Sequence, residues 1–323
     1  MSSLKLTDDL GRTLAFANPP QRIVSLVPSD THSMIALGAT SRLVGRTRFC
    51  ESPEVAHVVE VGGTKDVDVE AVVALAPDLV IANQEENPRI ALEALAGRVP
   101  VLVSLPRRVS DGIAHLARLA RILRLGAADP ARSLIRRAYQ LRDRTTTSRT
   151  LDLKTPADGL PILDSRRSSR ETSPTISFSD PLRGEPRDGR VRGFIPIWMN
   201  PLMTLNADTF GSDVLAQVGI ANVFGERLRL YPLAADLGKT APHDAVGRDV
   251  RYPRISTFEV KERNPELVIL PDEPYAFTAD DEAVFRDALP NARIVRVSGK
   301  DLFWYGAWTI DAIDRLAREL SPG

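Results

Sequence analysis

Short apolar runs alternate with amphipathic segments along the first part of the chain. Residues 22–27, 79–82 and 99–105 are rich in Val, Ile and Leu, and each has about the length of a buried strand. Segments with apolar residues at helical spacing lie between and after them, most clearly at 110–124. Nearly continuous apolar strands that alternate with helices are typical of a parallel sheet with helices on both faces.

The same alternation returns in the last part of the chain. Residues 266–270 and 293–297 are short apolar runs, and GFIPIW at 193–198 is a third. This pattern predicts a second α/β lobe. Its helices are expected at 209–218, 257–263, 280–288 and 308–320.

A helix and a polar segment separate these two parts. Asp129-Pro130 has the sequence of a helix start, a capping acid followed by a proline, and the helix is expected to run to about Arg144. Residues 145–193 are then rich in Ser, Thr, Arg, Pro, Asp and Gly, which indicates a flexible insertion. The alternative is a basic loop that docks a partner through Arg166, Arg167 and Arg170.

The two parts share a faint internal repeat. VEAVVALAPDLVI at 69–81 is echoed by TFEVKERNPELVI at 257–269, and LGATSRLVG at 37–45 by VGIANVFGE at 218–226. Chance similarity between two α/β units is the alternative, but the repeat favours two similar lobes. The predicted fold class is α/β, with two Rossmann-like lobes that contain parallel sheets and are joined by a single long bridging α-helix. The predicted boundaries are 1–20 for an N-terminal extension, 21–128 for the first lobe, 129–146 for the bridging helix, 147–192 for the insertion and 193–323 for the second lobe.

Composition narrows the function classes. The chain has 323 residues with 42 basic and 42 acidic side chains, so it lacks the basic excess of a nucleic-acid-coating protein. Its single cysteine, Cys50, excludes an internal disulfide framework and a multi-thiolate metal site. No apolar stretch approaches the roughly 20 residues of a membrane span, and the first residues do not form a secretory signal. We therefore expect either a cytoplasmic protein or a chain given without its leader.

Signals for catalysis and for metal binding are weak. The sequence has none of the common phosphate-binding, nucleophile-elbow or zinc-protease motifs, and its four histidines lack metal-ligand spacing. We therefore expect no enzyme activity, no metal site and no intrinsic cofactor. His32 follows a strand–helix turn, where α/β proteins bind ligands, but a packing role is the alternative. Glu85-Glu86 could form an acid/base pair, although a solvated or loop-capping role fits better without a partner nucleophile.

The aromatic residues give a clearer indication of a ligand. All three tryptophans, Trp198, Trp304 and Trp308, lie in the second half, and Tyr252 and Tyr275 lie in loops beside predicted elements. Aromatic side chains on several loops at one end of a sheet suit a flat, largely apolar ligand. A core role for each ring is the alternative.

Four segments in order, 20–50, 61–87, 197–224 and 252–275, resemble the substrate-binding proteins of ABC importers for cobalamin and ferric siderophores. GGTKD at 62–66 and QEEN at 84–87 look most like the cobalamin-binding branch. The resemblance implies ligand held in a cleft between two lobes, small lobe movement, an extracytoplasmic location and no catalysis. The implied ligand contacts are Pro28, Ser29, Asp30, Arg48, Phe49, Thr64 and Lys65 in the first lobe, and Trp198, Asn200, Tyr252, Trp304 and Tyr305 in the second.

The resemblance also implies docking to the importer's permease subunits through one acid on each lobe. Glu70 matches the first docking position. Aligned without gaps, the second position holds Phe258, and Glu259 is its neighbour. A shift of one residue turns a helical side chain by about 100°. Docking through Glu259 therefore requires a different helix face from that of the family.

The resemblance leads us to expect a binding protein that captures cobalamin or a related metal chelate and delivers it to an ABC importer. A cytoplasmic ligand-binding or sensing module of the same fold is one alternative. A ferric siderophore or haem as the ligand is another. An enzyme on this scaffold would need a catalytic group between the lobes, and no motif in the sequence supplies one.

Overall fold

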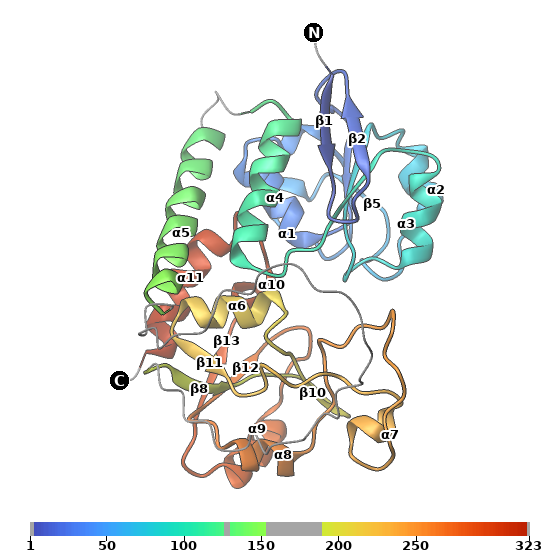
Figure 1. Ribbon diagram of the computed structural model, residues 1–323. Coiled ribbons are helices and arrows are strands. Elements are labelled where there is room, and N and C mark those ends of the chain that lie inside the picture. Colours follow the sequence, from blue (N-terminus) through green and yellow to red (C-terminus); the bar gives the residue numbers. More distant parts are fainter. Residues whose placement is uncertain (1–2, 126–129, 153–188, 322–323) are drawn as a thin grey trace, which may run out of the picture.

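The computed structural model describes residues 3–125, 130–152 and 189–321, and for 145–152 the helical backbone alone. It contains two α/β lobes, one above the other in Figure 1, with helix α5 (Ala131–Asp152) running along the side of both. The predicted fold class is therefore confirmed. The helix extends past the expected end near Arg144, and residues 153–188 of the predicted insertion, with Arg166, Arg167 and Arg170, lie outside the described residues.

The first lobe is built on a parallel five-stranded sheet with the order β5-β4-β3-β6-β7. Helices α1 and α4 pack on one face through a core that includes Met34, Ile81 and Leu116, and α2 and α3 pack on the other through Val72 and Leu95. The strands are Ile23–Ser25 (β3), Leu43–Arg46 (β4), Val59–Glu60 (β5), Leu79–Asn83 (β6) and Val101–Ser104 (β7), and the helices Pro28–Ala36 (α1), Val69–Ala74 (α2), Arg89–Ala96 (α3) and Val109–Ile122 (α4).

The second lobe has a parallel four-stranded sheet with the order β11-β8-β12-β13. Helices α6 and α11 contribute to the core on one face of the sheet, and α8 and α9 to the core on the other. The strands are Val191–Phe194 (β8), Ile220–Asn222 (β11), Leu267–Pro271 (β12) and Arg293–Val297 (β13), and the helices Phe210–Gln217 (α6), Thr257–Arg263 (α8), Ala279–Ala288 (α9) and Thr309–Leu320 (α11).

The predicted strand at 193–198 is in fact two strands. β8 ends at Phe194, and Pro196 begins β9 (Pro196–Met199), which pairs with β10 (Leu202–Thr204) in a separate antiparallel hairpin. A proline has no backbone N–H to donate to a sheet ladder, so the chain leaves the parallel sheet there. The hairpin carries Trp198 away from the core and toward solvent.

The internal repeat corresponds to equivalent units of the two lobes. Helix α2 is followed by β6, which pairs with two neighbours in the first sheet, and α8 is followed by β12, which does the same in the second. Gly38 and Gly219 follow α1 and α6 with positive φ angles of 75° and 79°. Glycine adopts this left-handed conformation without the steric cost of a side chain, so it ends both helices in the same way.

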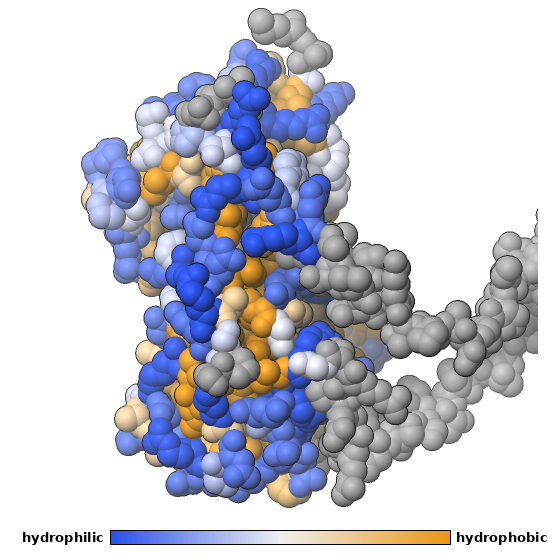
Figure 2. Space-filling model, turned by 90° about the vertical axis from the view of Figure 1, so that its left-hand side faces the viewer, coloured by the Kyte–Doolittle hydropathy of each residue, from blue (hydrophilic) through white to orange (hydrophobic). Residues whose placement is uncertain are grey.

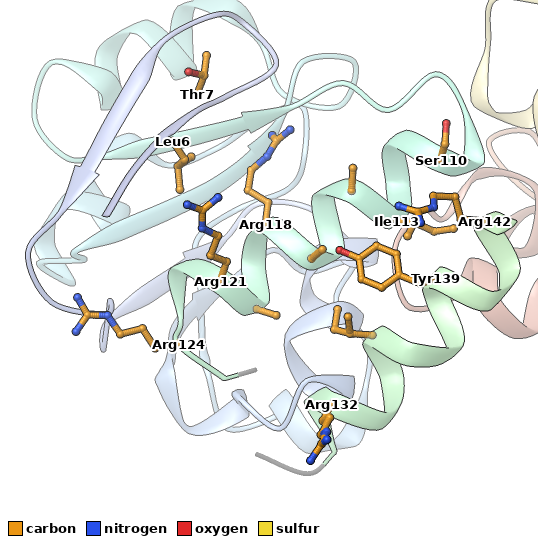
Figure 3. A pocket seen from close by; sticks show the side chains of 14 residues that line it. Leu6, Thr7, Ser110, Ile113, Arg118, Arg121, Arg124, Arg132, Tyr139 and Arg142 are labelled. Atoms are coloured by element: carbon orange, nitrogen blue, oxygen red, sulfur yellow. The ribbon is translucent and has the colours of Figure 1, made fainter. Parts of the chain in front are cut away.

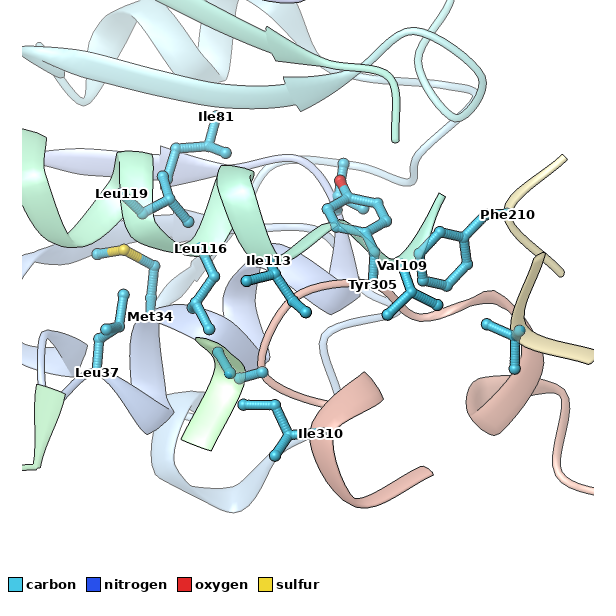
Figure 4. Close-up of a cluster of buried hydrophobic side chains, with 14 of the residues drawn as sticks. Met34, Leu37, Ile81, Val109, Ile113, Leu116, Leu119, Phe210, Tyr305 and Ile310 are labelled. Carbon is cyan, nitrogen blue, oxygen red and sulfur yellow. The ribbon is translucent and has the colours of Figure 1, made fainter. Parts of the chain in front are cut away.

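The two lobes share one apolar core rather than meeting through a loose hinge. The largest buried cluster includes Ile113 of α4, Val214 of α6 and Ile310 of α11, and α4 also packs against α5. Figure 4 shows part of this cluster where Phe210 and Tyr305 of the second lobe approach Val109 and Ile113 of the first. Separating the lobes would expose this apolar surface, so large rigid-body movement is disfavoured.

The N-terminal extension forms a hairpin of β1 (Leu4–Thr7) and β2 (Thr13–Phe16). It is tied to the first lobe by Arg12, whose Nη2 donates to the Val101 carbonyl at 3.0 Å, and by Asp9, which accepts from the Leu105 N–H at 2.8 Å. In the part of the chain that the structure describes, no helix has the length and apolar character needed to cross a membrane.

Candidate functional site

The loops that follow the parallel strands of both lobes contain the predicted ligand residues. Arg48 and Phe49 follow β4, Lys65 follows β5, and Glu85 follows β6, while Lys300 and Trp304 follow β13. Ligands of α/β proteins bind outside the carboxyl ends of parallel strands, where loops converge. The loop after β6 also contacts the second lobe, through Glu85 with Arg251 and Tyr252, so this region between the lobes is the candidate site and is called the interlobe site here.

A polar bridge joins the two lobes at this site. Glu85 of the first lobe accepts a hydrogen bond from Tyr252 Oη at 2.9 Å, and its Oε1 lies 2.5 Å from Arg251 Nη1. Arg251 is held in place by Asp249, through Nε at 2.9 Å and Nη2 at 2.7 Å. Glu85, Arg251 and Tyr252 are defined here as the cross-lobe bridge.

Burial shifts the pKa values of two groups in the cross-lobe bridge. Loss of water raises the pKa of the Glu85 carboxyl, although Arg251 and Tyr252 act in the opposite direction. Burial and the nearby Glu85 raise the pKa of Tyr252 well above its usual value. The phenol therefore stays protonated and donates to Glu85 at neutral pH.

Lys65 and Arg48 already face acidic groups. Lys65 Nζ donates to the Glu85 carbonyl and lies 3.8 Å from Glu86 Oε2. Arg48 pairs with Asp66, and its guanidinium also lies 5.4 Å from the ring centre of Phe49. The basic groups of the site are therefore largely neutralised by the protein itself.

Two aromatic groups of the site are partly open to solvent. Trp198 is 43% exposed and packs on Tyr275 with ring centres 5.2 Å apart, while its Nε1 donates to the carbonyl of Asn200, itself exposed. Phe49, on the first lobe, is 48% exposed. Single exposed rings are common on protein surfaces, but aromatic rings on both lobes beside one polar bridge can supply apolar contacts to a ligand held there.

Trp304 lies in a third aromatic group, next to His32. Its ring centre is 6.4 Å from that of His32 and 5.2 Å from that of Trp308, and Lys300 Nζ lies 4.9 Å from its centre. Burial lowers the pKa of His32, so the imidazole is neutral at pH 7. Burial raises the pKa of Glu273, which lies near Lys300.

Three predicted ligand residues are buried instead. Ser29 and Asp30 lie in the first turn of α1, directly after Pro28, and Tyr305 enters the first lobe from the second. Tyr305 Oη donates to Asp30 Oδ2 at 2.8 Å and lies 2.9 Å from Ser104 Oγ, and His115 Nε2 lies 2.8 Å from Asp30 Oδ1. These groups join the lobes internally. Thr64 is also buried, and its carbonyl accepts from Asn87 Nδ2 at 3.0 Å.

Sequence reasoning missed Arg251 and gave Glu85 a solvated or loop-capping role. The Glu85-Glu86 pair directly after a buried strand was the available signal for Glu85. The partner of Glu85 is 166 positions further along the chain, and no local pattern connects them. Buried His115 was missed as well, because its acidic partner lies on another helix.

The two predicted docking acids differ in their surroundings. Glu70 is exposed in the first turn of α2 and pairs with Arg98. On α8, Glu259 is only 24% exposed and binds Arg227 at 3.0 Å and Arg263 at 3.3 Å. Its neighbour Phe258 is 69% exposed. The outward-facing residue of this helix turn is therefore the phenylalanine.

No group of three or more His, Cys, Asp or Glu side chains suited to a metal ion occurs among the residues that the structure describes. Cys50 is buried, with its Sγ 3.0 Å from Thr31 Oγ1 and 3.3 Å from Thr47 Oγ1. These groups pack the strand–helix turns beneath the site.

Comparison with known proteins agrees with this architecture. A periplasmic binding protein family model matches residues 23–138. A vitamin B12-binding protein of Pectobacterium atrosepticum is 24% identical over 82% of this chain and 76% of its own length. Its counterpart in Yersinia pestis is 23% identical over 79% of this chain and 70% of its own length.

Two solved structures extend the likeness to both lobes. The periplasmic vitamin B12-binding protein of Vibrio cholerae has a TM-score of 0.61 at 18% identity, covering 94% of this chain and 97% of that one. The periplasmic haem-binding protein of the same organism has a TM-score of 0.62 at 17% identity, covering 94% and 99%. These matches confirm the resemblance found in the sequence. The chain is therefore similar to periplasmic binding proteins, in sequence over residues 23–138 and in fold over both lobes.

Proposed function

We propose that this chain is a substrate-binding protein that holds a flat metal chelate, cobalamin or a related tetrapyrrole, between its lobes and delivers it to an ABC importer. The observation that carries the proposal is the placement of exposed aromatic residues on both lobes, Phe49 in the loop after β4 and Trp198 in the β9–β10 hairpin, together with the polar bridge that joins the lobes. The names of the relatives support the same ligand class. These relatives are binding proteins, and the proposed role requires no turnover.

The charges at the site favour a chelate without several free carboxylates. Arg48 faces Asp66, Lys65 faces Glu86, and Arg251 faces both Asp249 and Glu85. A polyanionic ferric siderophore would compete with these carboxylates for the basic groups, and separating Arg251 from Glu85 would leave a largely buried carboxylate without this cationic partner. The corrin ring of cobalamin offers a broad apolar face with amide groups at its edge, which suits aromatic rings and scattered hydrogen-bonding groups.

Haem is the second candidate, and His32 is the observation that favours it. An imidazole binds a metal in its neutral form, and burial keeps His32 neutral at pH 7. Trp304 lies beside this ring and offers an apolar surface for a porphyrin. Among the described residues, none is recorded with a hydrogen bond to the His32 ring, so neither ring nitrogen is occupied by one of them.

Delivery to an importer would take place outside the cytoplasm, as the periplasmic relatives suggest. We propose that Glu70 supplies an acidic contact to the permease from the first lobe. The corresponding helix of the second lobe would supply Phe258, an apolar contact, because Glu259 is engaged by Arg227 and Arg263. A docking partner that fits this chain would therefore offer an arginine or lysine to one lobe and an apolar pocket to the other.

A panel of ligands tests the proposal. Purified protein is titrated with cyanocobalamin, with hemin and with ferric enterobactin, a polyanionic siderophore complex, and binding is followed by tryptophan quenching and by the absorbance of the chelate. We expect saturable binding of one tetrapyrrole with a Kd below about 1 μM, or about 8 kcal/mol. Failure of both tetrapyrroles with tight binding of ferric enterobactin would refute the charge argument, and failure of all three would refute the proposed ligand class.

A variant at Trp198 distinguishes the interlobe site from nonspecific binding. Trp198→Ala removes an exposed ring of the proposed site, and Phe258→Ala removes a still more exposed ring on α8, outside it. We expect weaker binding in the first variant and unchanged binding in the second. Equal effects of the two substitutions would show that the chelate binds apolar surface without using the interlobe site.

A further inference from the structure

An elongated groove lies on the outer face of the molecule, apart from the interlobe site. It has a volume of about 870 Å³ and runs between β1, α4 and α5 (Figure 3). None of the residues lining it is among the ligand contacts predicted for the interlobe site. The lining residues are Leu6, Thr7, Ser110, Ile113, Ala114, Ala117, Arg118, Ala120, Arg121, Arg124, Arg132, Ile135, Tyr139 and Arg142.

The floor of this groove is apolar and is lined by small side chains. Ala114, Ala117 and Ala120 of α4 contribute small side chains, and Leu6 and Ile135 close the sides. Figure 2 looks onto the side of the molecule that carries α5 and shows apolar residues in a band bordered by hydrophilic ones. Helices α4 and α5 pack against each other along the groove.

The rim of the groove is strongly basic. Five arginines line it, and among the described residues that line it none is acidic. The net charge of the whole chain is zero, so these arginines are a local concentration of positive charge. Arg118 and Arg121 project from α4, Arg124 follows the end of that helix, and Arg132 lies at the start of α5 (Figure 3).

Several of these guanidinium groups have unused hydrogen-bonding capacity. Arg118 Nη2 donates to Asp9 at 2.7 Å, but its Nη1 is buried and has no partner among the described residues. Arg121 and Arg132 are exposed, and no hydrogen bond or ion pair to their side chains is recorded within the described ranges. A buried donor without a partner costs free energy, and an anion at this rim would remove that cost.

We propose that this groove binds a single-chain amphiphile with an anionic head, of the fatty-acid class. The alkyl chain lies on the alanine floor between α4 and α5. The carboxylate accepts hydrogen bonds from the rim arginines. The groove is independent of the interlobe site, so both ligands bind at the same time.

Calorimetry with dodecanoate below its micelle concentration tests this proposal. We expect saturable one-to-one binding that is unchanged when the protein is first saturated with its interlobe chelate. The double substitution Arg121→Gln with Arg132→Gln should weaken binding about tenfold or more, since two charge-assisted hydrogen bonds are lost. Ala117→Trp, which fills the floor, should also abolish it. Arg136→Gln is the matched control, because Arg136 is an exposed arginine of α5 that does not line the groove.

Four results would overturn the proposal. Dodecanol binding as tightly as dodecanoate would remove the role of the arginines. Equal weakening by Arg136→Gln and by the double substitution would indicate a general effect of charge. Competition between dodecanoate and the interlobe chelate would place the amphiphile in the other site. Binding to phosphatidylglycerol vesicles without binding to dodecanoate would identify a membrane-surface patch. Thermal unfolding of each variant confirms that it is folded.

Discussion

The hydroxyl of Tyr305 lies 2.8 Å from the carboxylate of Asp30, although the two residues belong to different lobes. The other carboxylate oxygen of Asp30 lies 2.8 Å from His115 Nε2, and the side chains of Asp30, His115 and Tyr305 are all buried. Buried polar groups are costly unless they are hydrogen-bonded, so this network has one favourable arrangement of the lobes. Together with the shared apolar core, it supports small lobe movement during ligand binding.

Removing the Tyr305 hydroxyl should lower stability. Tyr305→Phe preserves the ring but removes one buried hydrogen-bond partner of Asp30 and one of Ser104, which should reduce the free energy of unfolding by about 1–3 kcal/mol. Urea denaturation measures this change. Tyr139→Phe is the control, since that ring is exposed and no hydrogen bond of its hydroxyl is recorded in the described ranges. A loss in Tyr305→Phe no greater than in the control would show that the network does not hold the lobes.

Weakening the cross-lobe bridge should speed ligand entry. Glu85→Gln keeps the shape of the side chain but removes the charge that attracts Arg251 at 2.5 Å. A ligand that enters between the lobes would have to separate this pair, so the variant should associate severalfold faster with the chelate. Stopped-flow quenching of tryptophan fluorescence gives the rate.

The matched control for this experiment is Glu93→Gln, which removes an exposed ion pair with Arg89 on α3. We expect its association rate to equal that of the parent protein. Slower association in Glu85→Gln would mean that the carboxylate helps to hold the ligand and does not obstruct it.

His32 should make stability depend on pH. Burial lowers its pKa in the folded protein, whereas in the unfolded chain the pKa is near 6.5. Below about pH 6.5 the unfolded state therefore binds a proton more readily, and stability falls as the pH falls; above that pH the two states do not differ at this group. His32→Asn should lose less stability than the parent protein between about pH 7.5 and 5.5.

The denaturant midpoints of the parent protein and of His32→Asn are measured at both pH values. The difference between the two proteins isolates His32, because their other groups titrate equally. His57→Asn, at an exposed position, should behave like the parent protein. If His32→Asn and the parent protein show the same pH dependence, the folded protein does not disfavour the protonated imidazole.

The architecture could be predicted from the sequence because the parallel strands are short apolar runs with clear helical segments between them. Helix α8 at 257–263 and β13 at 293–297 occur at their expected positions. The prediction of a single strand at 193–198 was wrong, because the apolar character of the segment did not reveal that Pro196 interrupts the hydrogen bonding of the sheet. The sequence also indicated that Phe258 and Glu259 lie on different faces of their helix. In the structure Phe258 faces solvent, whereas Glu259 binds Arg227.

The side-chain partners within the site could not be predicted in the same way. A resemblance transfers positions, and it placed Asp30 and Tyr305 on loops near the ligand. The contacts of a side chain depend on how the two lobes pack, and that packing joins Asp30 to Tyr305 and Glu85 to Arg251 across long stretches of sequence. The groove beside α5 was missed for a similar reason, because its arginines come from two helices whose separate sequences look like ordinary solvated faces.

The most direct test of the account is a calorimetric titration of the parent protein and of Trp198→Ala with cyanocobalamin and, separately, with hemin. We predict one-to-one binding of at least one of these chelates below about 1 μM, and affinity at least about tenfold lower in the variant, because the lost ring contributes about 1.4 kcal/mol or more. Absence of binding heat with both chelates, or equal affinity in the two proteins, would contradict a tetrapyrrole site between the lobes.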